Sequence, residues 1–318
     1  MAPPSGNLDG ADDREVYEGN ENKLNGFYDY PEWSGGFLDA GTIVLDNTDE
    51  GYQYSLTAKL RKNFTANAFT SLAYTYSQSK DLTSSPGEIA ADAFQINPAV
   101  GNINRPSLAY SDFGLEHRLI GVGSWRFDYA DHFATTVSIF FETGQGQRFS
   151  YVYAGDANLD GIGQNNDLIY VPNNASEINF DESEMSAAEQ WRLLNSYIEQ
   201  DGYLSSRRGQ YAERNGALGE WFAQIDLRIL QDFYLNVNDR RHTFQLSIDV
   251  LNVGNMISSD WGVRTIPQNV SPLSVNVDPN TNQALYKYNN PELQETFIND
   301  TGLISRWQMQ IGIRYLFD

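Results

Sequence analysis

Residues 51–64 read GYQYSLTAKLRKNF, and this stretch decides the fold class. From Tyr52 to Leu60, aromatic or apolar side chains occupy every second position, and polar side chains such as Gln53 and Lys59 lie between them. Because successive side chains of a β-strand point to opposite faces, this alternation predicts a strand with one apolar and one polar face. The same alternation recurs six times, in residues 68–77, 113–129, 135–142, 221–233, 244–250 and 307–317.

The lengths of these strands and of their connections distinguish them from the strands of soluble proteins. The strands run for roughly 13 to 17 residues, whereas about 5 or 6 is usual in globular proteins. Short turns alternate with long polar connections, which occupy residues 82–111, 145–220 and 256–304. Outer-membrane barrels have this asymmetry, with tight periplasmic turns and long outer loops.

Aromatic side chains at the strand ends give a second indication of a membrane barrel. Rings on the apolar face gather at both ends of the strands, as they do at the two interfaces of a bilayer. The sequence therefore predicts an all-β protein, a partial antiparallel transmembrane β-barrel of about seven long strands in contact with outer-membrane lipid. At the end with the short turns, the predicted membrane-interface residues are Phe64, Trp125, Phe127, Tyr129, Phe233 and Phe244.

Composition excludes several other classes of protein. The 318 residues carry 42 acidic against 21 basic side chains, a net charge of −21 that argues against nucleic-acid binding. No cysteine is present, so disulfide scaffolds, thiolate zinc sites and cysteine nucleophiles are excluded. Aromatic residues make up 13%, too many for a disordered chain. No apolar run approaches the roughly 18 residues of a membrane helix.

The first 50 residues form a region of their own. They begin MAPPSGNLDGADDREVYEGNEN, which has neither the charged nor the apolar region of a signal peptide. Twelve acidic residues stand against only Arg14 and Lys23, as in a solvated segment. We therefore predict an acidic outer loop or linker over residues 1–50 and a β-barrel segment over residues 51–318.

Ten ordered segments resemble the C-terminal part of TonB-dependent outer-membrane receptors, and in particular the Oar-like group related to the SusC-like transporters. Together they span residues 47 to 318 in the order typical of that family. The segments are NTDEGYQYSLTAKLRKNF, LAYTYSQSKDLTS, LAYSDFGLEHRLIGVGSWRF, FSYVYAGDANLDG, NNDLIYVP, RRGQYAERN, LQDFYLNV, LSIDVLNVGN, DWGV and SRWQMQIGIRYLFD.

This resemblance implies a 22-stranded barrel filled by an N-terminal plug, with uptake of a large nutrient powered through the TonB complex. The chain departs from that pattern, since it shows no plug, no TonB-contacting box and only seven strands. Seven is odd and below the usual minimum for a closed bacterial barrel, and lipid does not tolerate unpaired strand edges. We expect the last third of a receptor barrel in the outer membrane of a Gram-negative bacterium, whose partners are the missing plug and strands, the TonB complex and the barrel-assembly machinery.

Two short motifs suggest sites. Gln310, Gly312, Tyr315 and Phe317 resemble the C-terminal signal that the barrel-assembly machinery recognises, although Asp318 follows the last aromatic residue. An aromatic girdle end would explain the same residues. The second motif follows the spacing of a calcium-binding loop, with oxygen ligands at alternating positions and Gly161 at the sharp turn. Its possible Ca²⁺ ligands are Asp156, Asn158, Asp160, Ile162 (through its carbonyl), Gln164 and Asp167; an Asx-rich turn remains the alternative.

Two further features lie in the long 145–220 connection. Ser186 and Glu189 form a capping box ahead of apolar residues at helical spacing, which predicts one short loop helix packed on the loops or the barrel rim. Arg207, Arg208 and Arg214 could contact an anionic ligand, but pairing with nearby carboxylates explains them as well.

No catalytic residues emerge. His117, His132 and His242 are scattered, and no phosphate-binding loop occurs. The sequence therefore predicts a non-enzymatic transporter fragment whose wall is built from the strands and whose outer loops contact the ligand. Ca²⁺ is its one candidate cofactor. Two alternatives remain open: a structural or adhesion barrel of the outer membrane without TonB coupling, and a soluble calcium-binding β-protein that recognises glycans.

Overall fold

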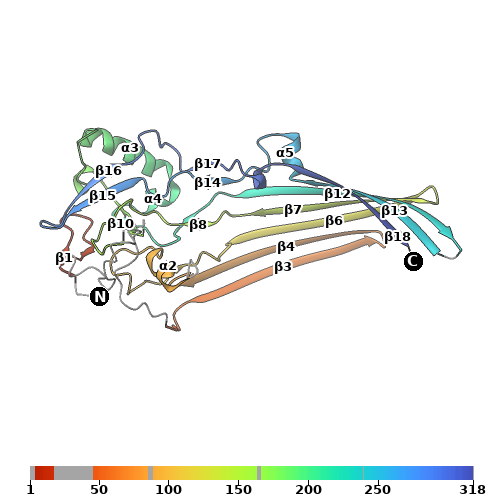
Figure 1. The fold of residues 1–318 in the computed structure, drawn as a ribbon, viewed down its shortest axis with the longest axis horizontal. Coiled ribbons are helices and arrows are strands. Elements are labelled where there is room, and N and C mark those ends of the chain that lie inside the picture. The colour runs from red at the N-terminus through yellow and green to blue at the C-terminus, as the bar shows by residue number, and fades with distance from the viewer. Residues whose placement is uncertain (1–3, 18–45, 85–88, 163–165, 239, 318) are drawn as a thin grey trace, which may run out of the picture.

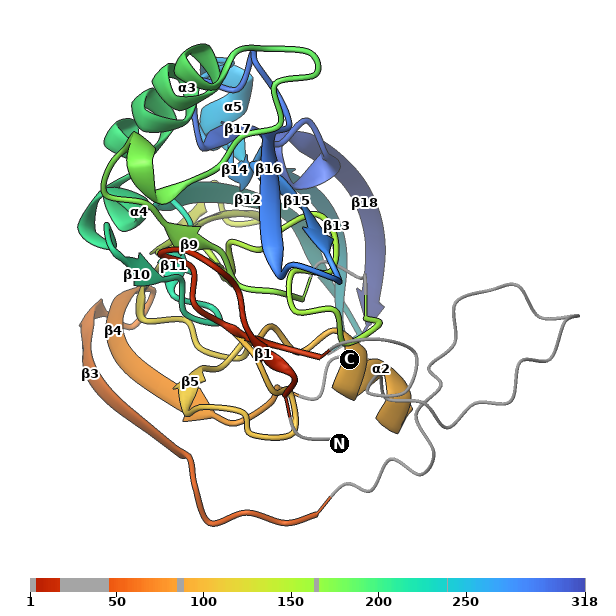
Figure 2. The ribbon, with the colours of Figure 1, turned by 90° about the vertical axis from the view of Figure 1, so that its left-hand side faces the viewer.

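The computed structural model describes residues 4–17, 46–84, 89–162, 166–238 and 240–317. In these residues the fold is all-β with antiparallel sheets, and one large curved sheet dominates it (Figures 1 and 2). Its seven long strands are the seven that the alternation predicts. They are β3 (Tyr52–Thr65), β4 (Ala68–Asp81), β6 (His117–Tyr129), β7 (Phe133–Gly144), β12 (Phe222–Val237), β13 (Arg240–Leu251) and β18 (Gln308–Phe317).

The strands follow one another across the sheet in chain order, from β3 to β18. The pairing sets Leu60 opposite Leu72, and Leu227 opposite both Ile139 and Val250. Because apolar positions are paired with apolar positions, this register places the apolar faces of all seven strands on one side of the sheet. A shift of one residue in any pair would move an apolar position to the polar side. In the described residues, β3 and β18 each pair with a long strand on one side only; the short β5 (Ala109–Tyr110) pairs with the end of β4.

The tight turns lie together at one end of the long sheet (Figure 1). Residues 66–67 join β3 to β4, and residues 130–132 join β6 to β7. Ala130 and Asp131 have φ values of 50° and 57°, the left-handed conformation that matches a hairpin turn to the twist of its strands. The hairpin of β12 and β13 turns at the same end, where Asn238 has a φ of 51°.

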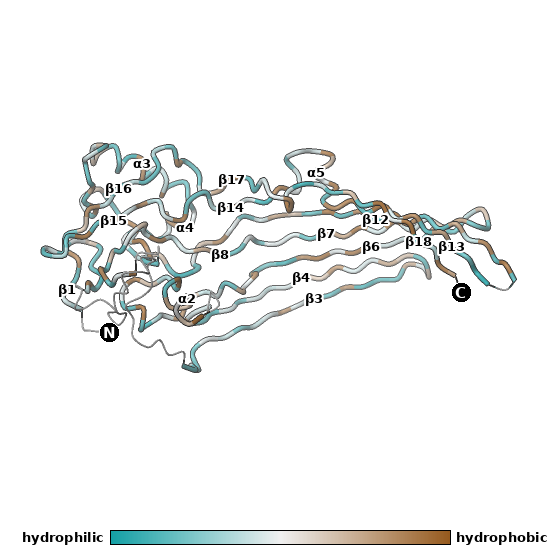
Figure 3. Tube along the Cα trace, viewed as in Figure 1, coloured by the Kyte–Doolittle hydropathy of each residue, from teal (hydrophilic) through white to brown (hydrophobic). Residues whose placement is uncertain are grey.

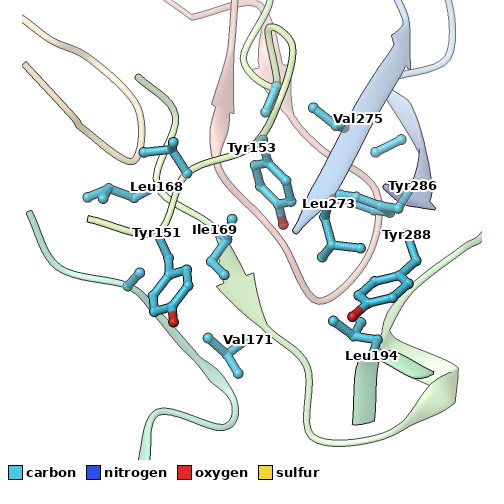
Figure 4. Close-up of a cluster of buried hydrophobic side chains, with 14 of the residues drawn as sticks. Tyr151, Tyr153, Leu168, Ile169, Val171, Leu194, Leu273, Val275, Tyr286 and Tyr288 are labelled. Atoms are coloured by element: carbon cyan, nitrogen blue, oxygen red, sulfur yellow. The ribbon is translucent and has the colours of Figure 1, made fainter. Parts of the chain in front are cut away.

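The long connections fold at the opposite end into a body with its own core, here called the loop unit: the described residues of 4–17, 145–220 and 256–304. Buried side chains from all three segments pack together in it, including Val16, Tyr151 and Leu273. Figure 4 shows Tyr151 and Leu273 within this core. The sequence predicted these connections only as long polar loops, whereas in the structure they also bury an apolar core. Their short strands are β1 (Gly6–Asn7), β2 (Glu15–Val16), β8 (Arg148–Phe149), β9 (Tyr170–Val171), β10 (Gln210–Tyr211), β11 (Ala217–Leu218), β14 (Thr265–Pro267), β15 (Leu273–Asp278), β16 (Gln283–Tyr288) and β17 (Phe297–Asn299).

The predicted loop helix is present as α3 (Ala187–Gln200), with Ser186 as its N-cap. The Ser186 hydroxyl accepts the Glu189 N–H at 3.4 Å, and Leu194 and Ile198 are buried against the loop unit's core. The expectation of a single loop helix was wrong, because short helical turns also form, two of them capped by the Asn174 and Asp201 side chains. These are α2 (Ala90–Gln95), α4 (Gly202–Ser206), α5 (Val253–Ile257) and the 3-10 turns Ala175–Glu177 and Leu303–Ser305.

Residues 4–17 contradict the expectation of a solvated acidic segment. Asp12, Arg14, Val16 and Tyr17 are all buried, and Figure 2 shows β1 among the strands of the loop unit. The acidic composition misled because Asp12 is neutralised by Arg14 inside the fold rather than by water. Residues 18–45 lie outside the described part of the chain.

Candidate functional site

A buried ion-pair cluster joins the N-terminal segment to the rest of the loop unit. Arg14 Nε donates to Asp12 Oδ1 at 2.9 Å, and its Nη1 donates to Asp167 Oδ1 at 3.3 Å. Asp12 also accepts the hydroxyls of Tyr153 at 3.0 Å and Tyr286 at 3.1 Å. The guanidinium is fully enclosed, and its Nη2 donates to the Leu168 carbonyl at 2.7 Å. Every strong donor of this cluster therefore has an acceptor, which a buried charge requires.

The electrostatics of the cluster follow from burial and pairing. Burial by itself lowers the pKa of Arg14, but the attraction of Asp12 and Asp167 outweighs it and the pKa of Arg14 is raised. Burial raises the pKa of the Tyr153 hydroxyl, and the charge of Asp12 raises it further. The cluster is therefore an arginine cation between two carboxylates, with neutral tyrosines donating to one of them.

The predicted calcium loop adopts the turn that its spacing implies. Asp156 accepts the N–H groups of Asp160 at 3.1 Å and Gly161 at 2.8 Å, and Gly161 has a φ of +87°. Asn158 Oδ1 also accepts the Asp160 N–H, at 3.1 Å. Asp160 Oδ1 accepts the Ile162 N–H at 2.9 Å. The side chains at positions 1, 3 and 5 of the motif thus fold inward around one short turn.

The twelfth position of the motif departs from a calcium loop. One oxygen of Asp167 pairs with Arg14, and the other accepts the Ala157 N–H at 2.8 Å. Gln164, the ninth-position residue, lies outside the described residues. No group of three or more His, Asp or Glu side chains within the described residues is arranged to hold a metal ion.

Burial disfavours the charged forms of two acids of this loop, Asp160 and Asp167. Burial, with the nearby charges of Asp156 and Asp167, raises the pKa of Asp160 to about 8. Burial also raises the pKa of Asp167 to about 7, although Arg14 and the Ala157 N–H lower it. A carboxylate with a raised pKa gains most from a nearby cation, so Asp160 is the residue on which metal binding would have the largest effect.

The predicted membrane-interface residues share one side of the large sheet. They lie near the tight turns and remain exposed, from 41% for Phe127 to 59% for Phe64. Further along the same side, Leu56 is 72% exposed and Ile313 is 70% exposed. Figure 3 shows apolar residues recurring along the strands far from the loop unit. The other four residues of this interface set are 43% to 56% exposed, namely Trp125, Tyr129, Phe233 and Phe244.

The opposite side of the sheet carries polar side chains that bind one another across strands. Arg118 Nε lies 2.8 Å from Glu142 Oε1, joining β6 to β7. Arg126 Nη1 lies 2.8 Å from Asp232 Oδ2, joining β6 to β12. Ser124 and Ser138 share a hydrogen bond of 2.9 Å on the same side. One side of the sheet is therefore largely apolar and exposed, whereas the other carries polar side chains that are hydrogen-bonded across the strands.

The C-terminal motif lies on β18, the last strand of the sheet. Gly312 faces Ser247, and a Cβ at this glycine would meet Ser247 Oγ at 2.7 Å, so no larger residue fits without a shift. The Tyr315 hydroxyl contacts His242 Nδ1 at 2.6 Å, and Phe317 lies opposite His242. Gln310 occupies the polar side with Asp249 as its neighbour. The four residues thus lie on a single strand with an unoccupied edge in the described sheet.

The arginines of the 207–215 segment pair with carboxylates. Arg207 binds Glu213, Arg208 Nη2 lies 3.9 Å from Glu199, and Arg214 Nη2 lies 2.6 Å from Asp81. The buried pair of Asp12 and Arg14 was not among the predicted site residues. Its only signal in the sequence is an acid and a base two positions apart in an acidic stretch.

Comparison with known proteins adds no relative: no family model matches the chain, and no curated protein or solved structure resembles it significantly. Among the described residues, no helix is long and apolar enough to cross a membrane.

Proposed function

We propose that this chain is the C-terminal barrel portion of a TonB-dependent outer-membrane transporter, whose strands form part of the barrel wall and whose loop unit contacts the ligand. The observation that carries the proposal is the sidedness of the large sheet. Seven strands align their apolar positions on one exposed side, and ion pairs line the other. A soluble sheet would bury that apolar side against a second layer.

The two strand edges support the same proposal. Every residue of β3 is exposed, and β18 has only one intermediate position, Gly312. An exposed edge of 14 residues is a template for pairing with another strand. In lipid each unpaired backbone group would cost several kcal/mol, so the membrane-embedded form needs further strands on both edges. These strands are the missing part of the barrel that the family resemblance implies.

The end-to-end asymmetry of the sheet supports an orientation. The loop unit lies at one end and the tight turns at the other (Figure 1). In outer-membrane barrels the long connections face outward and the short turns face the periplasm. Under this proposal the loop unit meets the ligand outside the cell, and the missing plug and the TonB complex act from the opposite side.

Calcium binding is the second part of the proposal. We infer that the 156–167 loop binds Ca²⁺ weakly, as a structural clip of the loop unit. Asp156, Asn158 and Asp160 would supply side-chain oxygens, and Ile162 a carbonyl. A bound cation would offset the repulsion among Asp156, Asp160 and Asp167.

Lipid contact can be tested with single cysteines, because the chain has none of its own. Ile139 and Ser138 are neighbours on β7 that point to opposite sides of the sheet. A fluorophore on Ile139→Cys should be quenched by brominated lipid after outer-membrane assembly with the missing strands, whereas one on Ser138→Cys should not. Equal quenching at both positions would reject the membrane wall. TonB coupling predicts that disabling the inner-membrane complex stops ligand uptake but leaves surface binding intact.

A further inference from the structure

A cavity of about 780 Å³ opens between the N-terminal segment and three other parts of the chain. Its walls come from residues 13–15, the outer end of β4 at Lys80, the 97–109 connection and the 207–214 segment. These parts meet at the end of the sheet that carries β1, β5 and β10 (Figure 2). The volume lies within the range of about 300 to 1,000 Å³ that is usual for small-molecule sites.

The charge of the lining is opposite in sign to that of the chain. Whereas acids outnumber bases two to one in the sequence, the cavity is lined by five bases and three acids. Two of these bases, Arg14 and Arg214, are buried and bind carboxylates outside the lining, Asp167 and Asp81. The lining bases are Arg14, Lys80, Arg105, Arg207 and Arg214, and the lining acids are Asp13, Glu15 and Glu213.

Two of the lining cations have no carboxylate partner within the described residues. The Lys80 ammonium lies over the Tyr110 ring, 4.5 Å from its centroid, and forms no ion pair there. Arg105 is exposed at the cavity and likewise pairs with none of the described acids. In a chain with so large an excess of carboxylates, two unpaired cations on one cavity mark a place where an anion is favoured.

Two polar atoms of the lining also lack partners among the described residues. Asn97 is only 4% exposed, and its Oδ1 has no donor, although its Nδ2 reaches the Leu82 carbonyl at 3.4 Å. Arg207 Nε is buried without an acceptor, whereas Nη2 of the same guanidinium binds Glu213. Buried polar atoms normally have partners, so a donor for Asn97 and an acceptor for Arg207 are the missing groups.

We propose that this cavity binds a small organic carboxylate that also carries hydroxyl or amide donors. The carboxylate would pair with Arg105 and Lys80, a ligand hydroxyl or N–H would donate to Asn97 Oδ1, and a ligand oxygen would accept from Arg207 Nε. Apolar lining residues such as Leu82 and Val100 would contact the carbon skeleton. The assignment rests on the proposed function, in which the loop unit contacts the ligand, and specifies the chemistry of that ligand.

Binding of two carboxylate probes to the full chain in detergent tests the assignment. Galacturonate represents a sugar acid, and glycylglycine with a free C-terminus represents a peptide carboxylate. Galactose and glycylglycine amide are the matched neutral-end controls. At least one carboxylate should bind measurably by calorimetry, and roughly ten-fold more tightly than its control, because a hydrogen bond to a charged group is worth about that factor. The better probe identifies the source of the carboxylate.

Variants locate the binding. Arg105→Gln removes an exposed lining charge, and Asn97→Ala removes the unpartnered acceptor; each should weaken the better probe roughly ten-fold. Arg192→Gln removes an exposed charge on α3, outside the lining, and should leave affinity unchanged. The near-UV circular dichroism spectrum of each variant, compared with that of the unchanged chain, tests whether the variant is folded.

Three results would overturn the assignment: no binding of either carboxylate to folded chain, equal binding of the neutral controls, or equal weakening by Arg192→Gln. If neither probe binds but Ile139→Cys is quenched by lipid, the carboxylate site is wrong while the barrel proposal remains. If a probe binds as expected but Ile139→Cys is not quenched, the site remains and the transporter proposal is wrong.

Discussion

Asp12→Ala tests whether the N-terminal segment is held in the loop unit by its buried charge. Asp12 accepts from Arg14 Nε at 2.9 Å and from the hydroxyls of Tyr153 and Tyr286 at 3.0 and 3.1 Å. The Tyr211 hydroxyl also reaches Asp12, at 3.1 Å, but it keeps Asp13 as an acceptor when Asp12 is removed. Each tyrosine left without an acceptor costs about 1 kcal/mol, and the lost charge-assisted bond costs about 1.5 to 3 kcal/mol. We expect a total loss of about 3 to 5 kcal/mol in unfolding free energy, the range for breaking a buried ion pair.

The neighbouring residue supplies the control. Asp13 is exposed, and its carboxylate accepts only the Tyr211 hydroxyl, at 3.0 Å, among the bonds of the described residues. Asp13→Ala should therefore cost no more than about 1 kcal/mol. Asp12→Asn, which keeps an acceptor oxygen but removes the charge, should fall between the two.

Guanidinium unfolding of the chain in detergent, followed by near-UV circular dichroism, measures all three variants. The packed Tyr153 and Tyr286 rings near Asp12 contribute to this signal, so loss of the loop unit's packing should change it. If Asp12→Ala and Asp13→Ala differed by less than about 1 kcal/mol, the Asp12–Arg14 cluster would not be what holds residues 4–17.

Three further predictions concern the sheet and the calcium loop. In the assembled barrel, Ile139→Arg on the apolar side should cost roughly 2 to 4 kcal/mol, and Arg228→Ala on the polar side much less, as measured by urea unfolding in lipid; the reverse order would mean that the two sides are misassigned. Calcium should raise the melting temperature of the loop unit by an amount that Asp156→Ala abolishes; identical melting with calcium and chelator would exclude the clip. The folded-state pKa of Asp160 is raised from 3.8 to about 8, so the stability that protonated Asp160 contributes without calcium should be complete below about pH 4 and be lost as the pH rises through 8. Asp160→Asn should flatten this decline in stability, and an unchanged pH profile would refute the assignment.

The long strands could be predicted from the sequence because strand periodicity is local. In β7, Val137 and Ile139 alternate with Thr136 and Ser138, and no distant residue is needed to assign the two faces. Three of the pairings also follow from the sequence, since a tight turn forces β3 to pair with β4, β6 with β7, and β12 with β13. The helix α3 was predictable for the same reason, because Ser186 and Glu189 are three residues apart.

The loop unit could not be predicted because its contacts are long-range. Asp12 meets Tyr286 across 274 residues, and Arg14 meets Asp167 across 153. Short apolar runs such as LSVNVD and QALYKY pair as β15 and β16, but their brevity leaves a strand indistinguishable from a polar loop. An acidic stretch is normally solvated, and only the fold reveals that one of its carboxylates faces a buried arginine.

Arg14 links the two electrostatic features of the loop unit. It pairs with Asp167, which occupies the twelfth position of the calcium loop, and so it already supplies a positive charge to that end of the loop. The opposite end keeps Asp156 and Asp160, whose mutual repulsion contributes to the raised pKa of Asp160. A cation bound there would attract the Asp160 carboxylate and hold it ionised. The positive charge of the cation would also offset the repulsion that Asp156 exerts on Asp167, so Asp167 would be freer to remain ionised against Arg14. Calcium at one end and residues 4–17 at the other should therefore stabilise each other, since both favour the ionised form of Asp167.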